Sequence, residues 1–336
     1  MPTNVTSQFT DTTSSDATQS VFNTLLLVRA TYDLIHQVPV KKYSLSRRNG
    51  KTMIFRRYDA LGLAKTPLTE GNPPAGKTKT KAEVSMTIQP YGDFIEDTDM
   101  VMDTQPDAQS VENTELLGQQ MGETFDELYR DMWAGLSNTV WPNGTSTATV
   151  TQLADRDTYD RAIRLLRVNK AKTFVPAIFA GQKVGTSAIM PAYWGMIDER
   201  VYFDLRHTEG FVLPVNYANG SATITGEGGA DKYGVRYLVS PNGYFLAGAT
   251  GVTAAGTDLK NTASFLDIYS VFIVGKEAAG GLNLAGGNGG IIRKGLGSAG
   301  TADPLDQRQT IGWKKYDART ILNQAFAVEV QTPVSL

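Results

Sequence analysis

The chain has 336 residues and a formal net charge of −2, from 32 lysines and arginines against 34 aspartates and glutamates. Near-neutral charge favours neither nucleic acid nor a membrane surface as the main partner. The chain contains no cysteine, which excludes disulfides, thiolate metal sites and cysteine nucleophiles. No apolar run approaches the roughly 20 residues that a membrane helix needs. The length suggests two structural units or one elaborated domain.

The first 20 residues are mostly serine, threonine, aspartate and asparagine, with little to bury. This composition predicts disorder in an isolated chain. If the tail is ordered, a neighbouring subunit is the simplest candidate for holding it.

Two strand-like segments, residues 52–59 and 82–92, predict a long hairpin. In the second segment, Val84, Met86 and Ile88 alternate with polar residues, which is the period of a half-buried strand. The connection between the segments carries turn-forming residues, namely Pro67, Gly71, Pro73, Pro74 and Gly76. Because an extended chain rises about 3.3 Å per residue, we expect the hairpin to project roughly 30 Å and to lie across another molecule.

Residues 71–78, GNPPAGKT, match the phosphate-binding pattern G-x-x-x-x-G-K-[ST]. That pattern needs a buried strand before the loop and a helix that begins at the lysine and threonine. Here the upstream segment contains Lys65, Pro67 and Glu70, and the downstream segment has the period of a strand. The sequence therefore favours a chance match near a hairpin tip over a nucleotide site.

An acidic segment at 93–103 precedes the clearest helix, which we predict from Ala108 to Leu136. Apolar side chains recur at the three-and-four spacing of one helical face, at Leu117, Met121, Phe125, Leu128, Met132 and Leu136. Charged residues are expected on the other side, at Asp126, Glu127, Arg130 and Asp131. At 1.5 Å per residue the helix would be about 40 Å long, which is the length of a strut.

Residues suited to catalysis are scarce. His36 and His207 have polar or aliphatic neighbours and no second histidine at metal-ligand spacing, which indicates surface or packing roles. The glycine-rich segment 278–295 follows an apolar strand but contains no G-x-G-x-x-G frame, so we interpret it as a flexible surface loop. The sequence predicts neither enzyme activity nor a cofactor.

The elements after residue 150 are shorter. We expect a helix at 156–169; a short strand, a helix opening near Pro191 and a turn over 186–206; strands at 233–240 and 264–275; and a short helix running into a strand over 318–332. Helices and strands do not alternate as they do in a doubly wound sheet. The sequence therefore predicts an α+β fold.

Five stretches, taken in order, resemble the N-four-type family of tailed-bacteriophage major capsid proteins. They are FRRYDALGLAKTPLTEGNPPAGKT, YGDFIEDTDMVMD, LLGQQMGETFDELYRDMW, GEGGADKYGVRYLVSPN and DPLDQRQTIGWKKYDARTIL, and they span roughly residues 50–325. The resemblance implies the HK-ninety-seven-type coat fold. It also implies a subunit that self-assembles into the hexamers and pentamers of an icosahedral phage head enclosing double-stranded DNA, with no nucleotide bound at the GNPPAGKT stretch.

The resemblance implies five regions along the chain. They are an N-terminal arm at 1–48, an extended-loop hairpin at 49–95, a peripheral domain at 96–185 with a spine helix near 108–136, an axial domain near 186–285, and a return to the peripheral domain with a C-terminal strand at 286–336. The subunit would be made in the host cytoplasm and end in the virion.

The charged residues of the hairpin and of the acidic segment are the candidate contacts between subunits. They are Arg56, Arg57, Glu70, Lys77, Lys79, Lys81, Asp93, Glu96, Asp97, Asp99 and Asp103. We expect the lysines of one subunit to pair with the carboxylates of another. Alternatively each set is a solvated face, because exposed ion pairs contribute little individually. The acidic residues could also hold a divalent cation, although they lack calcium-loop spacing.

The expected partners are other copies of the chain, a portal, a scaffold formed by a separate chain, and non-specifically contacted DNA; decoration proteins are a further candidate, and no membrane is expected. Nothing in the sequence marks a lysine and asparagine pair for cross-linking. Two other functions stay open: a cellular nanocompartment shell of the same fold, and a nucleotide hydrolase that uses Lys77.

Overall fold

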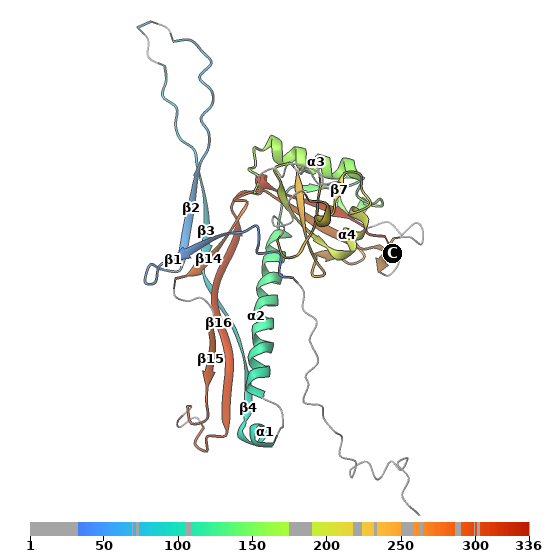
Figure 1. Ribbon diagram of the computed structural model, residues 1–336. Coiled ribbons are helices and arrows are strands. Elements are labelled where there is room, and N and C mark those ends of the chain that lie inside the picture. The colour runs from blue at the N-terminus through green and yellow to red at the C-terminus, as the bar shows by residue number, and fades with distance from the viewer. Residues whose placement is uncertain are drawn as a thin grey trace, which may run out of the picture.

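The computed structural model describes residues 33–68, 70–71, 74–104, 109–174, 190–217, 224–231, 234–249, 259–262, 265–285, 290–298, 300 and 303–335. Figure 1 shows an elongated chain, with a hairpin that projects at one end, a long sheet and helix in the middle, and a compact lobe of shorter elements to one side. The predicted α+β fold is confirmed. The expectation for residues 1–20 falls outside the described residues.

The first sheet is built around one long strand. It contains β1 (Lys41–Leu45), β4 (Gln89–Thr98), β14 (Ala279–Leu284), β15 (Gly290–Lys294) and β16 (Arg308–Ile321). Strand β16 pairs antiparallel with β4, β14 and β15, and β1 is parallel to β14. Strand β16 therefore joins β4, from the first third of the sequence, to β14 and β15, from near its end.

Helix α2 (Gln109–Trp133) follows the short helix α1 (Asp99–Thr104) and packs along β16 (Figure 1). Its predicted apolar stripe is confirmed at Leu117 and Phe125, which contact Ile311 and Trp313 of the sheet. At 1.5 Å per residue the helix is about 37 Å long. None of the helices in the described part of the chain is long and apolar enough to span a membrane.

The predicted hairpin is confirmed as β2 (Thr52–Tyr58) and β3 (Lys81–Thr87), which pair antiparallel from Thr52 opposite Thr87 to Tyr58 opposite Lys81. Beyond the last pair, the amide of Asp59 donates to the carbonyl of Thr80 at 3.1 Å. Buried Met86 and Ile88 pack with Leu282 of β14, which anchors the base of the hairpin to the first sheet.

The second sheet forms the lobe and has eight strands. In spatial order they are β5 (Thr139–Val140), β17 (Ala327–Thr332), β13 (Ile268–Val274), β6 (Tyr193–Asp198), β9 (Val235–Ser240), β8 (Glu227–Asp231) and β7 (Phe211–Val212), with β10 (Phe245–Leu246) paired to β13. Every residue of β13 is buried. Helices α3 (Arg156–Val168) and α4 (Glu199–Leu205) pack on one face, and Trp133 at the end of α2 packs on the other.

Short elements complete the described fold. They are the pair β11 (Asn261–Thr262) and β12 (Phe265–Leu266) and the 3-10 turns η2 (Thr147–Thr149), η3 (Pro214–Asn216) and η6 (Gln324–Phe326).

The helix expected near Pro191 is wrong. Residues 193–198 form the buried strand β6 instead, and α4 begins only after Asp198, whose side chain accepts from the amide of Arg200. The helix starts there because this carboxylate caps its first turn. The short strand expected at the start of this segment falls largely outside the described residues.

Two other expectations need correction. The expected C-terminal helix is only the 3-10 turn η6, because residues 318–321 continue the long strand β16. The glycine-rich segment is not a flexible loop where it is described, since residues 279–284 form the strand β14, and its first four residues are buried. A Cβ atom on Gly281 would lie 2.4 Å from the hydroxyl of Tyr129, so glycine is needed there for close packing.

Candidate functional site

The loop between β2 and β3 projects from the body of the chain (Figure 1). Every described residue from Tyr58 to Thr80 is exposed. The exposed fraction is 54% for Leu61, 79% for Leu63 and 75% for Leu68. Apolar side chains gathered in one exposed segment are typical of an interaction surface. We call Leu61, Leu63 and Leu68 the loop leucines.

The phosphate-binding match lies in this loop and lacks the helix that the motif requires. Described residues 74–80 have no regular structure, and a strand follows the motif as predicted, although β3 covers Lys81–Thr87 and not the whole of 82–92. The ammonium of Lys77 donates to the carbonyl of Gly62 at 2.6 Å, which ties the two sides of the loop together. The geometry gives Lys77 a structural role in the loop.

The charged residues at the loop end of the two hairpin strands pair within the chain. Lys81 lies 2.6 Å and Arg56 lies 3.4 Å from Glu83, and the hydrogen bond from Lys81 lowers the pKa of that carboxyl. Arg57 lies 3.9 Å from Asp59. Lys79 and Glu70 are exposed in the loop.

The acidic candidates follow β4 from its middle to α1, and most have a partner in the same chain. Asp93 accepts from Gln120 at 2.7 Å and from the amide of Phe94, and these bonds lower its pKa. The other contacts are Glu96 with Arg308 at 3.4 Å, Asp97 with Asn113 at 2.6 Å, and Asp99 with the amide of Met100 at 2.7 Å; Asp103 is exposed.

The structure does not bring the two candidate sets together within one chain. The hairpin loop lies at one end of the molecule and α1 lies at the other (Figure 1). Their pairing between subunits stays a prediction. Histidine, aspartate and glutamate side chains of the described residues do not gather in any group of three that could hold a metal.

Helix α2 carries a buried ionisable pair that the sequence did not predict. Asp126 is fully buried, which corrects its expected place on the polar side of the helix. It accepts from the amide of His36 at 2.9 Å and lies 2.7 Å from the Nδ1 atom of the same residue. The indole of Trp133 donates to the carbonyl of His36 at 3.0 Å. The surface or packing roles expected for the two histidines are confirmed, since His36 is buried and His207 is exposed.

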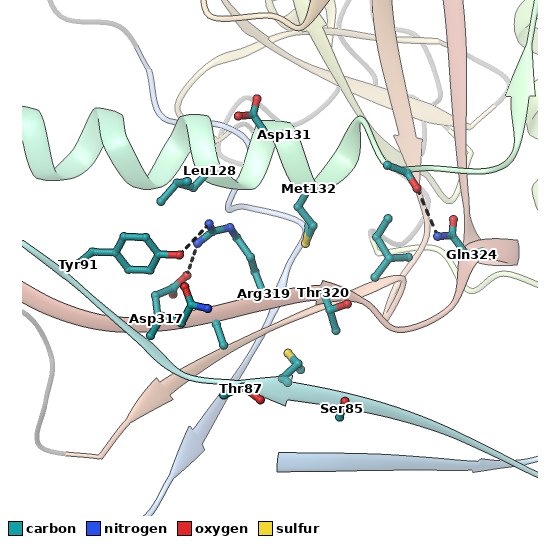
Figure 2. Close-up of a pocket in the computed structure, with 15 residues that line it drawn as sticks. Ser85, Thr87, Tyr91, Leu128, Asp131, Met132, Asp317, Arg319, Thr320 and Gln324 are labelled. Atoms are coloured by element: carbon teal, nitrogen blue, oxygen red, sulfur yellow. Dashed lines mark hydrogen bonds and ion pairs between the residues drawn. The ribbon is translucent and has the colours of Figure 1, made fainter. Parts of the chain in front are cut away.

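A groove of about 600 Å³ lies between α2, the base of the hairpin and β16 (Figure 2). Arg319 stands in it, and its guanidinium donates to Asp317 at 3.0 Å and to the hydroxyl of Tyr91 at 3.3 Å. Burial raises the pKa of Asp317, and Arg319 opposes that shift. The charges of Asp317 and Arg319 therefore satisfy each other within the groove.

The opposite face of the first sheet carries an apolar patch. Phe94 and Ile292 flank Gly312 in the strand register and are 63% and 47% exposed. The neighbouring Trp313 packs toward α2, so alternation along β16 puts the Gly312 row on the other face. The alternation was readable in the sequence, but the pairing that joins these strands was not.

Known proteins match this chain by its structure but not by its sequence. No protein-family model and no curated protein matches the sequence. The fold is similar to a chain from the capsid of Ralstonia phage GP4, with a TM-score of 0.68, 12% identity, and 97% of each chain covered.

Two further solved structures give the same result. A chain from the capsid asymmetric unit of cyanophage Pam1 has a TM-score of 0.61 at 13% identity, covering 98% of this chain and 99% of that one. A chain from the capsid of cyanophage P-SCSP1u has a TM-score of 0.60 at 14% identity, covering 94% and 93%. The chain therefore has, over nearly its whole length, the fold of phage capsid chains.

Proposed function

We propose that this chain is the major capsid protein of a tailed phage, of the N-four type and with the HK-ninety-seven-type coat fold. Its copies would form hexamers and pentamers that close into an icosahedral head around double-stranded DNA. The observation that carries the proposal is the likeness to phage capsid chains across more than nine tenths of this chain. The role is structural, without catalysis.

The regions of that fold correspond to parts of the molecule. We assign the arm to residues 1–48, the extended loop to 49–95, the peripheral domain to 96–185 and 286–336, and the axial domain to about 186–285. The projecting hairpin, the long helix α2 and the second sheet support these assignments.

The hairpin supplies the main contact between neighbouring subunits in this proposal. A loop without a core leaves the loop leucines in water, and burying them against another copy would recover about 25 cal/mol for each Å² of apolar area. Each contact is modest, and a closed lattice gains its strength because every subunit repeats the contact.

Opposite charges would guide that contact. Lys77 and Lys79 in the loop and Asp99 and Asp103 at the far end of the first sheet are too far apart to pair in one chain, so neighbours can pair them. Charge reversal at Lys79 should weaken assembly at low salt more than at high salt, since salt screens exposed pairs. Equal assembly at both salt concentrations would remove this part of the proposal.

Electron microscopy of the purified chain, alone and from infected or co-expressing cells, tests the function. We expect closed shells or five-fold and six-fold rings. The portal, scaffold and decoration partners would be found by their co-purification with those particles. Small particles alone, even with assembly partners present, would contradict a coat function.

A further inference from the structure

Three lysines from separate parts of the chain meet where the two sheets adjoin. Lys41 begins β1, Lys172 follows α3, and Lys276 lies in the turn between β13 and β14. All three side chains are exposed. We call Lys41, Lys172 and Lys276 the lysine cluster.

The backbone holds this cluster together. The amide of Lys276 donates to the carbonyl of Lys172 at 2.8 Å. Gly275 permits this approach, because a Cβ atom there would lie 3.0 Å from the Cβ of Ala171. Glu277 then adopts a left-handed conformation with φ of 65° and turns the chain into β14. The positions of the lysines are therefore set by the fold.

Among the described residues, one carboxylate, that of Glu277, forms an ion pair within the lysine cluster. Lys41 donates to Glu277 at 2.6 Å, and this bond, with the charges of Lys41, Lys172 and Lys276, lowers the pKa of Glu277. One negative charge among three positive charges leaves the cluster at +2. The near-neutral net charge of the chain conceals this local excess.

A purely structural role explains only part of the arrangement. Cations near the C-terminus of a helix interact favourably with its dipole, and Lys170 and Lys172 follow the end of α3. Lys41 lies in strand β1 and Lys276 lies in the turn between β13 and β14. Neither follows the end of a helix, so a helix dipole does not explain their positions. Their convergence concentrates positive charge on one exposed surface, which suits an anion.

We propose that the lysine cluster contacts the phosphate backbone of the DNA that the shell encloses. This inference rests on the proposed function. Lysine is a compact, mobile point charge, which suits contacts with phosphates that do not depend on sequence. Each such contact releases counterions. The logarithm of the binding constant should therefore fall linearly with the logarithm of the salt concentration, with a slope of about −0.9 for each phosphate contacted.

The test is a titration of the purified full chain with a short mixed-sequence DNA duplex at several salt concentrations. The variant that combines Lys172→Glu with Lys276→Glu should bind about tenfold more weakly and lower the salt slope by about two. A control that combines Lys51→Glu with Lys294→Glu changes the net charge equally at exposed sites elsewhere, and it should bind like the wild type.

A second variant keeps the test decisive if the first does not fold. Glu277→Gln removes the carboxylate that pairs with Lys41 and should raise the affinity, whereas Glu209→Gln, exposed elsewhere, should not. Unchanged binding in all variants, or equal loss in the cluster and control variants, would overturn the inference.

Microscopy of the same variants separates this inference from the coat function. We expect Lys172→Glu with Lys276→Glu to form shells. Loss of shells with unchanged DNA affinity would make the cluster a contact between subunits, which overturns the DNA contact and leaves the coat function intact. Absence of shells in the wild type would instead count against the coat function.

Discussion

The hairpin loop and the second sheet both contain large apolar side chains, which are exposed in the loop and buried in the sheet. Leu63 and Leu68 are 79% and 75% exposed, whereas Phe272 is 1% exposed and belongs to strand β13, which lies between β6 and β17. Burial stabilises a chain only where the side chain leaves water. The second sheet therefore stabilises the subunit, and the loop can stabilise only contacts with another molecule.

The sharpest way to separate the two regions is to replace the two most exposed loop leucines. We expect the variant Leu63→Ser with Leu68→Ser to abolish shells, because the lost contact recurs in every subunit. Its free energy of unfolding as a subunit should change by less than about 0.5 kcal/mol. Sedimentation and denaturant unfolding measure the two quantities. The control Val215→Ser, at a side chain that is 91% exposed, should assemble normally.

The opposite result is expected in the second sheet. Phe272→Ala should lower the free energy of unfolding by about 3–5 kcal/mol, through lost burial and the cavity left behind. Phe94→Ala, at a ring that is 63% exposed, should cost less than about 1 kcal/mol. Similar values for the two variants in denaturant unfolding would contradict the division between stabilising core and exposed surface.

The buried pair on α2 extends the comparison to polar groups. Asp126→Ala should lower the free energy of unfolding by about 3 kcal/mol, because the amide and ring of His36 lose their buried acceptor. Asp131→Ala changes an exposed carboxylate on the same helix and should cost less than about 0.5 kcal/mol. Urea unfolding of both variants measures these two changes. Equal losses in the free energy of unfolding would contradict the stabilising role of the buried Asp126–His36 pair.

A smaller effect is expected at the start of α3. The hydroxyl and amide of Thr158 donate to Asp155, at 2.7 Å and 3.0 Å, and lower the pKa of this cap. A lowered folded pKa means stability that is present above the ordinary aspartate pKa and is lost as pH falls through the folded value. Asp155→Ala should cost about 1 kcal/mol at neutral pH. Thermal unfolding should find a smaller difference from wild type in acid, and a constant difference would be inconsistent with this cap.

The spacing of residues within a short stretch of sequence predicted the helix and the hairpin, whose formation depends on neighbouring residues. The three-and-four spacing of apolar residues predicted α2 within three residues of its ends, and alternation with turn residues predicted the β2–β3 hairpin. These elements depend on side chains that are close in sequence. The charged candidates were predicted as a set, but their separation to two ends of the molecule was not.

Contacts between distant segments account for the errors. Asp126 is buried because the segment around His36 crosses α2, 90 residues away in sequence. The glycine-rich segment is a strand because Tyr129 and β16 close over it, which composition cannot reveal. Likewise, the sequence near Pro191 predicted a helix, whereas pairing with β9 and β13 makes residues 193–198 the strand β6.

The most direct test of the hairpin as a contact between subunits uses a single introduced thiol. Because the chain has no cysteine, Leu63→Cys can be labelled without background. Electron microscopy should first establish that this variant forms shells. We predict rapid labelling of the unassembled subunit and strong protection in the shell, while the control Val215→Cys reacts rapidly in the unassembled subunit. Equal labelling of Leu63→Cys in subunit and shell would contradict the central claim that the loop lies against a neighbour.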